Sequence, residues 1–355
     1  MPKLWKVKRE LQRVGQQLSG FIEKYTDPRK QHRANQAIEN GLPQMDGSVS
    51  RSGKIAIFLL FQPSGLSPSI FETLNFLIAN GYAPFVVSNA PISQTDRDKL
   101  SQFIWRGVER ENFGYDFGGY RDGILCLNKW GIKPDELIIL NDSVWLPTLP
   151  ETDLFEKLSS HSADIAGTNL RVRGDVKFLE SYLYRFNKYT LMHPKFIDFW
   201  HNIKLTSNKY YVIRRGERGF SQAMLEAVLT VEGLFDQTEF LIKIRQQNDD
   251  FLRKTLRFAA YTDSSLAQKR DKLLAYSDPD WREKALQHIE DVLKKWLAYS
   301  TFPYAMVKLF KYPLLKKSND FVSKKWRAGY ISAVESGDLP PPGHVLWHEI
   351  RQKDI

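Results

Sequence analysis

Apolar positions in the first residues of this chain are spaced as in a helix, whereas continuous apolar runs typical of strands begin near residue 54. This change separates an N-terminal segment from the rest of the chain. The first residues space apolar side chains by threes and fours, from Leu4 through Val14 to Tyr25, which predicts a helix with one apolar seam. Residues 26–52 are polar and contain proline and glycine, so they predict a linker. The run "KIAIFLLF", which starts at Lys54, is typical of a parallel strand buried on both faces.

A helical period follows this strand, and a second strand-like run, "YAPFVVSN", ends at Asn89. Residues 54–89 therefore predict a strand–helix–strand unit with parallel strands. The cycle then repeats, with "TDRDKLSQFI" as a helix, "GVERE" as a short strand, a glycine-rich stretch that leads into a helix, and "DELIILND" as a strand. The pattern predicts an α/β fold with a mostly parallel sheet flanked by helices.

Polar side chains follow these predicted strands at their carboxyl ends. In open parallel sheets, ligands bind just outside this edge. If the strands are parallel, the edge collects Ser88, Asn89, Asn112, Asp116, Asn141 and Asp142. A simple turn cap built from residues 141–143 is the alternative interpretation of the last two.

The stretch "ENFGYDFGGYRDGI", residues 111–124, places Gly114, Gly118 and Gly119 directly before a predicted helix. Such glycines would let backbone N–H groups approach a phosphate or a sugar closely, helped by the positive end of the helix. Their spacing matches neither a dinucleotide-binding nor a Walker A motif, so a plain tight turn stays open. Carboxylates in the same stretch and in "LNDS" are suited to holding a divalent cation against a diphosphate.

Composition narrows the class of protein. The chain has 355 residues, 42% of them apolar, and a net charge of +10, which favours an anionic partner such as nucleic acid, a membrane surface or a phosphorylated substrate. Cys126 is its only cysteine, which excludes disulfides and cysteine-based zinc sites within one chain and predicts a core residue. No apolar run reaches the length of a membrane-spanning helix or a signal peptide, so we expect a cytoplasmic location.

Two motifs together resemble a known family. "ENFGYDFGGYRDGI" followed by "ELIILNDSVWLP", with "VVSN" before them and "ERGFSQAMLEAVLTVEGL" after them, is similar to the rhamnan synthesis protein F family of bacterial polysaccharide glycosyltransferases. The similarity covers about residues 53–240. It implies a GT-A-like fold that moves a sugar, such as rhamnose or another deoxyhexose, from a nucleotide diphosphate sugar to a growing cell-surface polysaccharide or lipopolysaccharide.

The resemblance also implies roles for individual residues. Glu217, which opens the "ERGFSQ" helix, resembles the acid on the acceptor side and is the candidate catalytic base. Asp142 stands where many GT-A enzymes carry Asp-x-Asp, and it is the second catalytic candidate and the candidate metal ligand. The donor would be bound by Ser88, Asn89, Asn112, Gly114, Asp116, Gly119, Arg121, Asp122 and Asn141.

One carboxylate in "NDS" replaces the usual pair, so two versions of the chemistry stay open. In one, Mn²⁺ or Mg²⁺ neutralises the departing nucleotide diphosphate. In the other, no metal is needed and an arginine supplies the positive charge, the candidates being Arg121, Arg214, Arg215 and Arg218.

The predicted organisation has three parts: a basic amphipathic helix and linker (1–52), a GT-A-like domain (53–245) and a basic helical region (246–355). The first helix either packs on the protein body or lies on an anionic membrane at the inner face of the cytoplasmic membrane, where a lipid-linked glycan acceptor would reside. Two other functions compete with transfer. Basic residues interleaved with aromatic ones after residue 294 favour nucleic-acid binding, and an inactive scaffold of a polysaccharide assembly complex is the second alternative.

Overall fold

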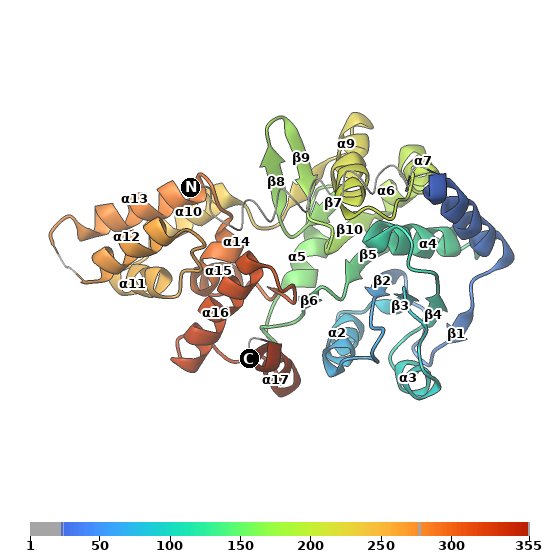
Figure 1. The fold of residues 1–355 in the computed structure, drawn as a ribbon, viewed down its shortest axis with the longest axis horizontal. Coiled ribbons are helices and arrows are strands. Elements are labelled where there is room, and N and C mark those ends of the chain that lie inside the picture. The colour runs from blue at the N-terminus through green and yellow to red at the C-terminus, as the bar shows by residue number, and fades with distance from the viewer. Residues whose placement is uncertain (1–22, 24, 276–277, 354–355) are drawn as a thin grey trace. The chain divides into compact units, whose positions relative to one another are not determined.

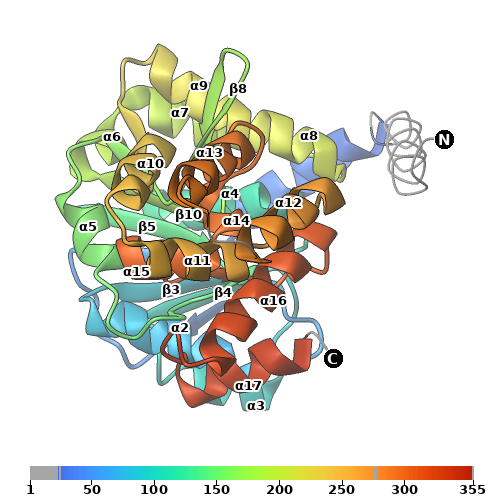
Figure 2. The same ribbon diagram turned by 90° about the vertical axis from the view of Figure 1, so that its left-hand side faces the viewer.

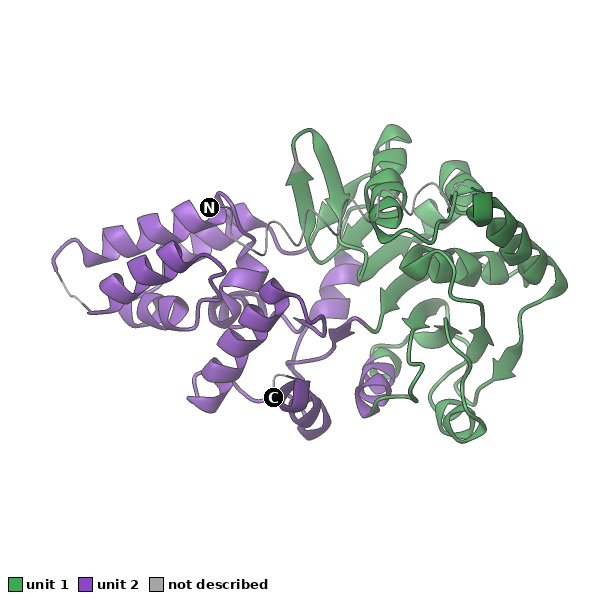
Figure 3. Ribbon diagram, in the orientation of Figure 1, with its two compact units in different colours: residues 1–67, 77–142, 161–233 green, residues 68–76, 143–160, 234–355 purple. Residues whose placement is uncertain are grey.

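The computed structural model describes residues 23, 25–275 and 278–353 (Figure 1). The amphipathic helix expected at residues 1–25 thus falls almost entirely outside the described residues. The chain forms two compact units (Figure 3). The first contains the described residues up to Ser67 together with Leu77–Asp142 and His161–Gly233, and the second contains Pro68–Phe76, Ser143–Ser160 and the chain from Leu234 onward.

An eight-stranded sheet forms the centre of the first unit, in the order β1-β4-β3-β2-β5-β10-β7-β11. The four strands predicted from apolar runs are parallel to one another, whereas β1 and β10 are antiparallel to their neighbours. The predicted α/β class with a mostly parallel sheet is therefore confirmed. The strands are β1 (Gln44–Asp46), β2 (Lys54–Leu60), β3 (Ala83–Ser88), β4 (Arg106–Glu109), β5 (Glu136–Asn141), β7 (Ile165–Gly167), β10 (Leu183–Asn187) and β11 (Val231–Gly233).

Helices cover both faces of this sheet. The helices α4, α7 and α9 lie on one face and α3 lies on the other (Figure 2). A separate hairpin, β8 (Leu170–Arg173) with β9 (Val176–Leu179), completes the unit. The helices are α3 (Gln94–Leu100), α4 (Tyr115–Lys129), α6 (Lys188–Met192), α7 (Pro194–Asn202), α8 (Lys209–Ile213), the π-helical turn η1 (Arg214–Arg218) and α9 (Gly219–Glu226).

Residues 25–40 are helical, where the sequence predicts a linker. One face of this helix carries Ala34, Ala37 and Ile38, which pack with the core of the first unit. Lys129 holds the end of the helix by donating a hydrogen bond to the carbonyl oxygen of Ile38, N···O 2.9 Å. The linker prediction is wrong for this segment because a narrow apolar face suffices once a core is present to receive it.

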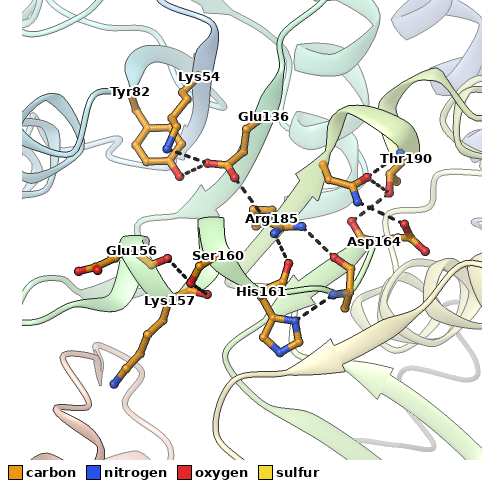
Figure 4. A network of polar contacts seen from close by, with 12 residues as sticks. Lys54, Tyr82, Glu136, Glu156, Lys157, Ser160, His161, Asp164, Arg185 and Thr190 are labelled. Carbon is orange, nitrogen blue, oxygen red and sulfur yellow. Dashed lines mark hydrogen bonds and ion pairs between the residues drawn. The ribbon is translucent and has the colours of Figure 1, made fainter.

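A buried ion pair ties the antiparallel strand β10 to β5 (Figure 4). Arg185 Nε lies 3.5 Å from Oε2 of Glu136, and the guanidinium also donates to the carbonyl oxygens of Ala163 and His161. The hydroxyl of Tyr82 donates to the other carboxylate oxygen of Glu136. Burial lowers the pKa of Arg185, and the charge of Glu136 opposes that shift. Both partners also make hydrogen bonds to other groups, and such additional bonds help a buried ion pair to be tolerated.

The second unit is mainly helical, as predicted for the C-terminal region. Glu349 joins distant segments of it, because its carboxylate accepts the N–H of Ser69 (2.8 Å) and the indole N–H of Trp145 (3.0 Å). The helix α2 (Pro68–Ala79) begins in this unit and ends in the first. The other elements are β6 (Val144–Trp145), α5 (Leu154–Ser160), α10 (Gln237–Arg245), α11 (Asp249–Arg257), α12 (Ser264–Ala275), α13 (Trp281–Leu293), α14 (Ala298–Thr301), α15 (Pro303–Phe310), β12 (Leu315–Lys316), α16 (Phe321–Glu335) and α17 (His344–Lys353).

The aromatic residues that favour nucleic-acid binding in the sequence are mostly core residues. Phe302, Tyr304, Phe310 and Tyr312 are all buried, and the rings of Phe302 and Phe310 stack on Phe240. A base-stacking platform needs exposed ring faces, so these four side chains do not supply one. Cys126 is also buried, as predicted, and burial raises the pKa of its thiol to about 12.

Within the described residues, no helix is both long enough and apolar enough to cross a lipid bilayer.

Candidate active site

The carboxyl ends of four parallel strands form one edge of the sheet. In the strand register, Leu60 of β2 pairs with Ser88 of β3, which pairs with Glu109 of β4, and Leu59 pairs with Asn141 of β5. The residues that follow these strands therefore emerge side by side. This arrangement is the one on which the sequence-based hypothesis of a shared polar edge depends.

Asp142 follows β5 at this edge and is held in a defined orientation. Its Oδ2 accepts the N–H of Phe61 at 2.9 Å and the side-chain amide of Gln62 at 2.6 Å, both just beyond the end of β2. Its own N–H donates to the carbonyl oxygen of Leu59, N···O 3.1 Å. Within the described part of the chain, Oδ1 makes no hydrogen bond. The carboxylate thus bridges to β2 instead of capping its own turn, and it keeps one oxygen open.

Asp116 and Tyr120 lie one turn apart on α4, so they share a face of the helix. Tyr120 is fully buried, and its hydroxyl donates to the carbonyl oxygen of Ser181 at 2.8 Å. Burial is the main cause that raises the pKa of Tyr120, and the charge of Asp116 adds to it. Asp142 raises this pKa further, while a hydrogen bond with Asn141 lowers it. Asp116, Asn141 and Asp142, three predicted site residues, therefore all affect the pKa of Tyr120.

Glu217 approaches the same place from η1. Its Oε1 accepts the hydroxyl of Ser181 at 2.6 Å and the N–H of Ser181 at 3.2 Å. Burial raises the pKa of Tyr184, and the charges of Glu217, Glu180 and Asp116 add to this effect in that order. The charges of Glu217 and Asp116 thus both raise the pKa of the buried Tyr184.

A close contact between the backbone of η1 and the ring of Phe117 in α4 places Glu217. A Cβ atom on Gly216 would lie 2.3 Å from the ring of Phe117 in α4, so only glycine allows η1 to come this near. The turn is π-helical, a local irregularity often found at functional sites. Tyr120 and Glu217 thus both hydrogen-bond to Ser181, and Asp116 and Asp142, which are partly exposed like Glu217, both raise the pKa of the buried Tyr120.

A second group of predicted donor-binding residues lies inside the protein. Arg110 Nε is 2.6 Å from Asp122 Oδ2, and its Nη1 donates to Oδ1 of Asn89 at 2.7 Å. Arg121 Nη1 lies 2.8 Å from Asp122 Oδ1, and its Nη2 donates to Asn35. All of these side chains except that of Asn35 are buried. The network fixes the start of α4 behind the edge of the sheet.

The remaining predicted positions divide between the surface and the interior. Asn112 is exposed in the loop before α4. Ser88 is buried, and its hydroxyl donates to the carbonyl oxygen of Ala90 at 2.6 Å. Gly114 caps α4 with φ +83°, a backbone conformation that favours glycine.

Gly119 faces the sheet. A Cβ atom there would lie 2.2 Å from Cδ1 of Leu59, and one on Gly118 would lie 2.0 Å from the carbonyl oxygen of Phe113. These two glycines let α4 pack closely against β2 and against the loop that precedes the helix. Close packing within the fold, and not only access for a ligand, thus explains the glycine-rich stretch.

Four residues of this region were not predicted as site residues: Gln62, Arg110, Tyr120 and Ser181. Two of them carry a signal in the sequence. Gln62 follows the end of a buried strand, and Tyr120 stands four positions after Asp116 on a predicted helix. Ser181 precedes β10, which joins the sheet as an antiparallel strand, and no local pattern indicates that contact.

The donor atoms available for a metal are few. Within the described residues, no group of three or more His, Cys, Asp or Glu side chains is arranged to hold a metal ion. Mg²⁺ is commonly held by only one or two carboxylates, with substrate phosphates and water completing its octahedron. The open oxygen of Asp142 fits such a site, in which the protein contributes a minor share of the ligands.

Two of the solved structures that match the chain illustrate a weak similarity. A nucleoside-diphosphate-sugar pyrophosphorylase from Vibrio cholerae RC9 is 13% identical, with a TM-score of 0.29, over 52% of this chain and 93% of the other. A mannosyltransferase from Pyrobaculum calidifontis, solved with GDP-Man and Mn²⁺, is 10% identical, with a TM-score of 0.29, over 91% of this chain and 98% of the other.

Sequence comparison gives a nearer relative. The uncharacterized protein y4gN of Sinorhizobium fredii (strain NBRC 101917 / NGR234) is 35% identical over 217 residues. The match covers 60% of this chain and spans only 56% of the relative's length. A family model matches as well, and it confirms the resemblance seen in the motifs: residues 85–256 of this chain match rhamnan synthesis protein F.

Proposed function

We propose that the first unit is a glycosyltransferase that moves a sugar from a nucleotide diphosphate donor to a growing polysaccharide. One observation carries the proposal: Asp142 follows a parallel strand at the carboxyl edge of the sheet, Asp116 lies one turn before Tyr120 on α4, and Tyr120 and Glu217 both hydrogen-bond to Ser181. The match to rhamnan synthesis protein F supports a polysaccharide product, with rhamnose or another deoxyhexose as the transferred sugar. We propose the same GT-A-like architecture for the unit.

Glu217 is the proposed catalytic base. An acceptor hydroxyl is a poor nucleophile, so a carboxylate must take its proton while the new glycosidic bond forms. Oε1 of Glu217 is occupied by Ser181, and this bond fixes the direction of the carboxylate. The proton passes from the acceptor oxygen to Glu217, the acceptor oxygen bonds to the anomeric carbon, and the bond from that carbon to the nucleotide diphosphate breaks.

Asp142 and Asp116 are the proposed donor-side acids. Asp142 would bind a divalent cation through its open oxygen, and Mn²⁺ or Mg²⁺ would neutralise the charge that the diphosphate gains as it departs. Asn141 and Asn112 would donate hydrogen bonds to the donor. Arg110, Arg121, Asp122 and Asn89 hold the start of α4 in place, so we assign them, together with Ser88, Gly114 and Gly119, a positioning role.

Arginine remains the alternative source of positive charge. The guanidinium of Arg121 is occupied by Asp122 and Asn35, which leaves the cations of η1 as the better candidates. Arg218 follows Glu217 directly, and its guanidinium lies over the ring of Phe178, 5.3 Å from the centroid. Binding of a nucleoside diphosphate in the presence of EDTA, measured by calorimetry, separates the two versions. Unchanged affinity favours arginine, and affinity restored by Mn²⁺ or Mg²⁺ favours the metal.

The proposal is tested first by donor binding. A thermal-shift screen against UDP-, dTDP- and GDP-sugars should raise the melting temperature for at least one donor, because a ligand at 100 times its Kd stabilises a fold by about 2.7 kcal/mol. Turnover is then measured with that donor. Absence of binding to every donor contradicts the proposal, and binding without any transfer identifies an inactive scaffold.

Two conservative variants locate the chemistry. Glu217→Gln keeps an oxygen for Ser181 but removes the base, so kcat should fall by about 10²–10⁴ while donor affinity is retained. Asp142→Asn should abolish transfer and weaken donor binding while the melting temperature stays near that of the wild type. Asp98→Asn, at an exposed position of α3, is the matched control and should leave sugar transfer and donor binding unchanged. Full transfer by Asp142→Asn would remove that residue from the site.

A further inference from the structure

A groove in the first unit lies beside the helix that carries Glu217. Its cavity has a volume of about 650 Å³, within the range of sites for small molecules and short oligomers. One wall is the helix of residues 25–40, and the other is α8 with the loop before it. The lining includes Asp27, Gln31, Lys204, Thr206, Tyr211 and Arg215.

Hydrogen bonds join the two walls of the groove to each other. The carboxylate of Asp27 accepts the N–H and the hydroxyl of Ser207, at 3.2 and 3.0 Å. The side-chain oxygen of Gln31 accepts the N–H of Leu205 at 2.9 Å. Lys30 also donates to the hydroxyl of Ser207, N···O 2.8 Å. A preformed groove loses little conformational entropy when a ligand binds, so this one is suited to recognition.

The chemistry of the lining favours an uncharged, hydroxyl-rich ligand. The lining contains two acids, Glu23 and Asp27, and two bases, Lys204 and Arg215, so its charges balance. Such a surface does not select for a phosphate or a lipid headgroup. Tyr211 adds an aromatic ring, and the Arg215 guanidinium lies over one face of it, 5.2 Å from the ring centroid. Rings of this kind offer an apolar face with a polar tip, which matches the alternating faces of a sugar.

A second tyrosine connects the groove to the candidate active site. Tyr115 is 40% exposed, and its hydroxyl donates to the carbonyl oxygen of Ser207 at 3.2 Å, on the loop that lines the groove. The next residue in the chain is Asp116. Leu205 of the groove packs against Gly114, where a Cβ atom would lie 2.9 Å from its Cδ2. The loop that forms the groove therefore contacts the start of α4 directly before the first acid of the site.

The helix on the other side makes the same connection. Tyr211 and Arg215 lie one turn apart on α8 and η1, facing the groove. Glu217 follows two residues later and points to another side of the same helix, toward Ser181. The groove and the proposed base thus belong to one rigid element, so that an extended molecule in the groove is held at a constant distance from Glu217.

From this geometry we propose that the groove binds the acceptor glycan as a neutral oligosaccharide, with Tyr211 as a stacking platform and Tyr115 at the passage to the active site. The inference rests on the proposed glycosyltransferase function, whose acceptor it locates.

Direct binding of glycans tests the inference apart from catalysis. The full chain is titrated with neutral tetrasaccharides of rhamnose, glucose, galactose and mannose, and the Kd is measured by saturation-transfer NMR. At least one tetrasaccharide should bind, and Tyr211→Ala should weaken it by roughly tenfold, or about 1.4 kcal/mol. Tyr211→Phe keeps the ring and should stay within about twofold of the wild type. Tyr189→Ala removes an exposed tyrosine of α6 and serves as the matched control.

Donor binding is measured on the same variants, so that the two proposals fail separately. Tyr211→Ala should bind the nucleotide diphosphate sugar as the wild type does. If the donor binds but no tetrasaccharide does, or if Tyr211→Ala binds the tetrasaccharide normally, the groove is not the acceptor site and the glycosyltransferase proposal still stands. If no donor binds, the glycosyltransferase proposal fails, whatever the groove holds.

Discussion

The close contact between α4 and β2 gives a prediction whose sign is decided by two opposing effects. Gly119 lies in the interior of α4, where alanine normally stabilises a helix by about 0.5–1 kcal/mol over glycine. Here the added Cβ would lie 2.2 Å from Cδ1 and 3.0 Å from Cδ2 of Leu59. Carbon atoms in contact are separated by about 3.5–4.0 Å, so the methyl group overlaps the leucine.

The overlap should outweigh the gain in helix propensity. Leu59 is 2% exposed in the middle of the sheet, so its side chain has no free space into which to turn. Forcing a methyl group into a packed core costs about 1–3 kcal/mol, and an overlap of this size belongs at the upper end. Subtracting the propensity gain from about 3 kcal/mol leaves Gly119→Ala destabilised by about 2–2.5 kcal/mol. The melting temperature should fall by about 2–4 °C for each kcal/mol lost.

Urea denaturation followed by circular dichroism measures this effect, with Gly219→Ala as the control. Gly219 is also helical, but the nearest atom to an added Cβ is 3.4 Å away, so that variant should gain about 0.4–1 kcal/mol. In a Leu59→Ala background the space is vacated, and Gly119→Ala should become neutral or stabilising. If Gly119→Ala is as stable as the wild type in the native background, close packing does not explain this glycine.

Three further predictions concern other parts of the structure. Arg110→Met leaves the buried carboxylate of Asp122 with one fewer partner and should lower the free energy of unfolding by about 3–5 kcal/mol in urea titration. Gly216→Ala would press on the ring of Phe117 and displace η1, so kcat should fall while donor affinity is unchanged, as steady-state kinetics with the donor can show. Burial lowers the pKa of His288, with Lys269 adding to the shift, so the unfolded chain takes up this proton first. Stability should therefore fall as the pH drops from about 6.5 toward the folded pKa, and His288→Gln should reduce that loss in thermal melts.

Each of these three predictions has a control variant or a result that would contradict it. Lys243→Met breaks an exposed pair with Glu239 and should leave the urea midpoint unchanged, in contrast to Arg110→Met. A Gly216→Ala enzyme with normal kcat would show that the close approach of η1 to α4 does not set the position of Glu217. For His288, equal loss of stability in acid by the wild type and the glutamine variant would mean that other groups cause it.

The sequence by itself determined the class of fold and the edge of the sheet at which we propose the site. Continuous apolar runs such as 55–61 and 137–140 are typical of strands covered on both faces, and helical periods lie between them. Parallel strands place their carboxyl ends together, so Asp142 and the start of α4 had to emerge at one edge. Both conclusions follow from patterns within single segments of the sequence.

Only the tertiary structure decided which of the polar residues face that edge and which are buried behind it. Asp116 and Asp122 stand six positions apart in one motif, yet the first is partly exposed beside Tyr120 and the second is enclosed by Arg110. The contact of Glu217 with Ser181 joins residues 36 positions apart and depends on an antiparallel strand and a π-helical turn that no sequence period encodes. Periodicity indicates which face of a helix or strand is apolar. What that face contacts depends on how all the elements pack together.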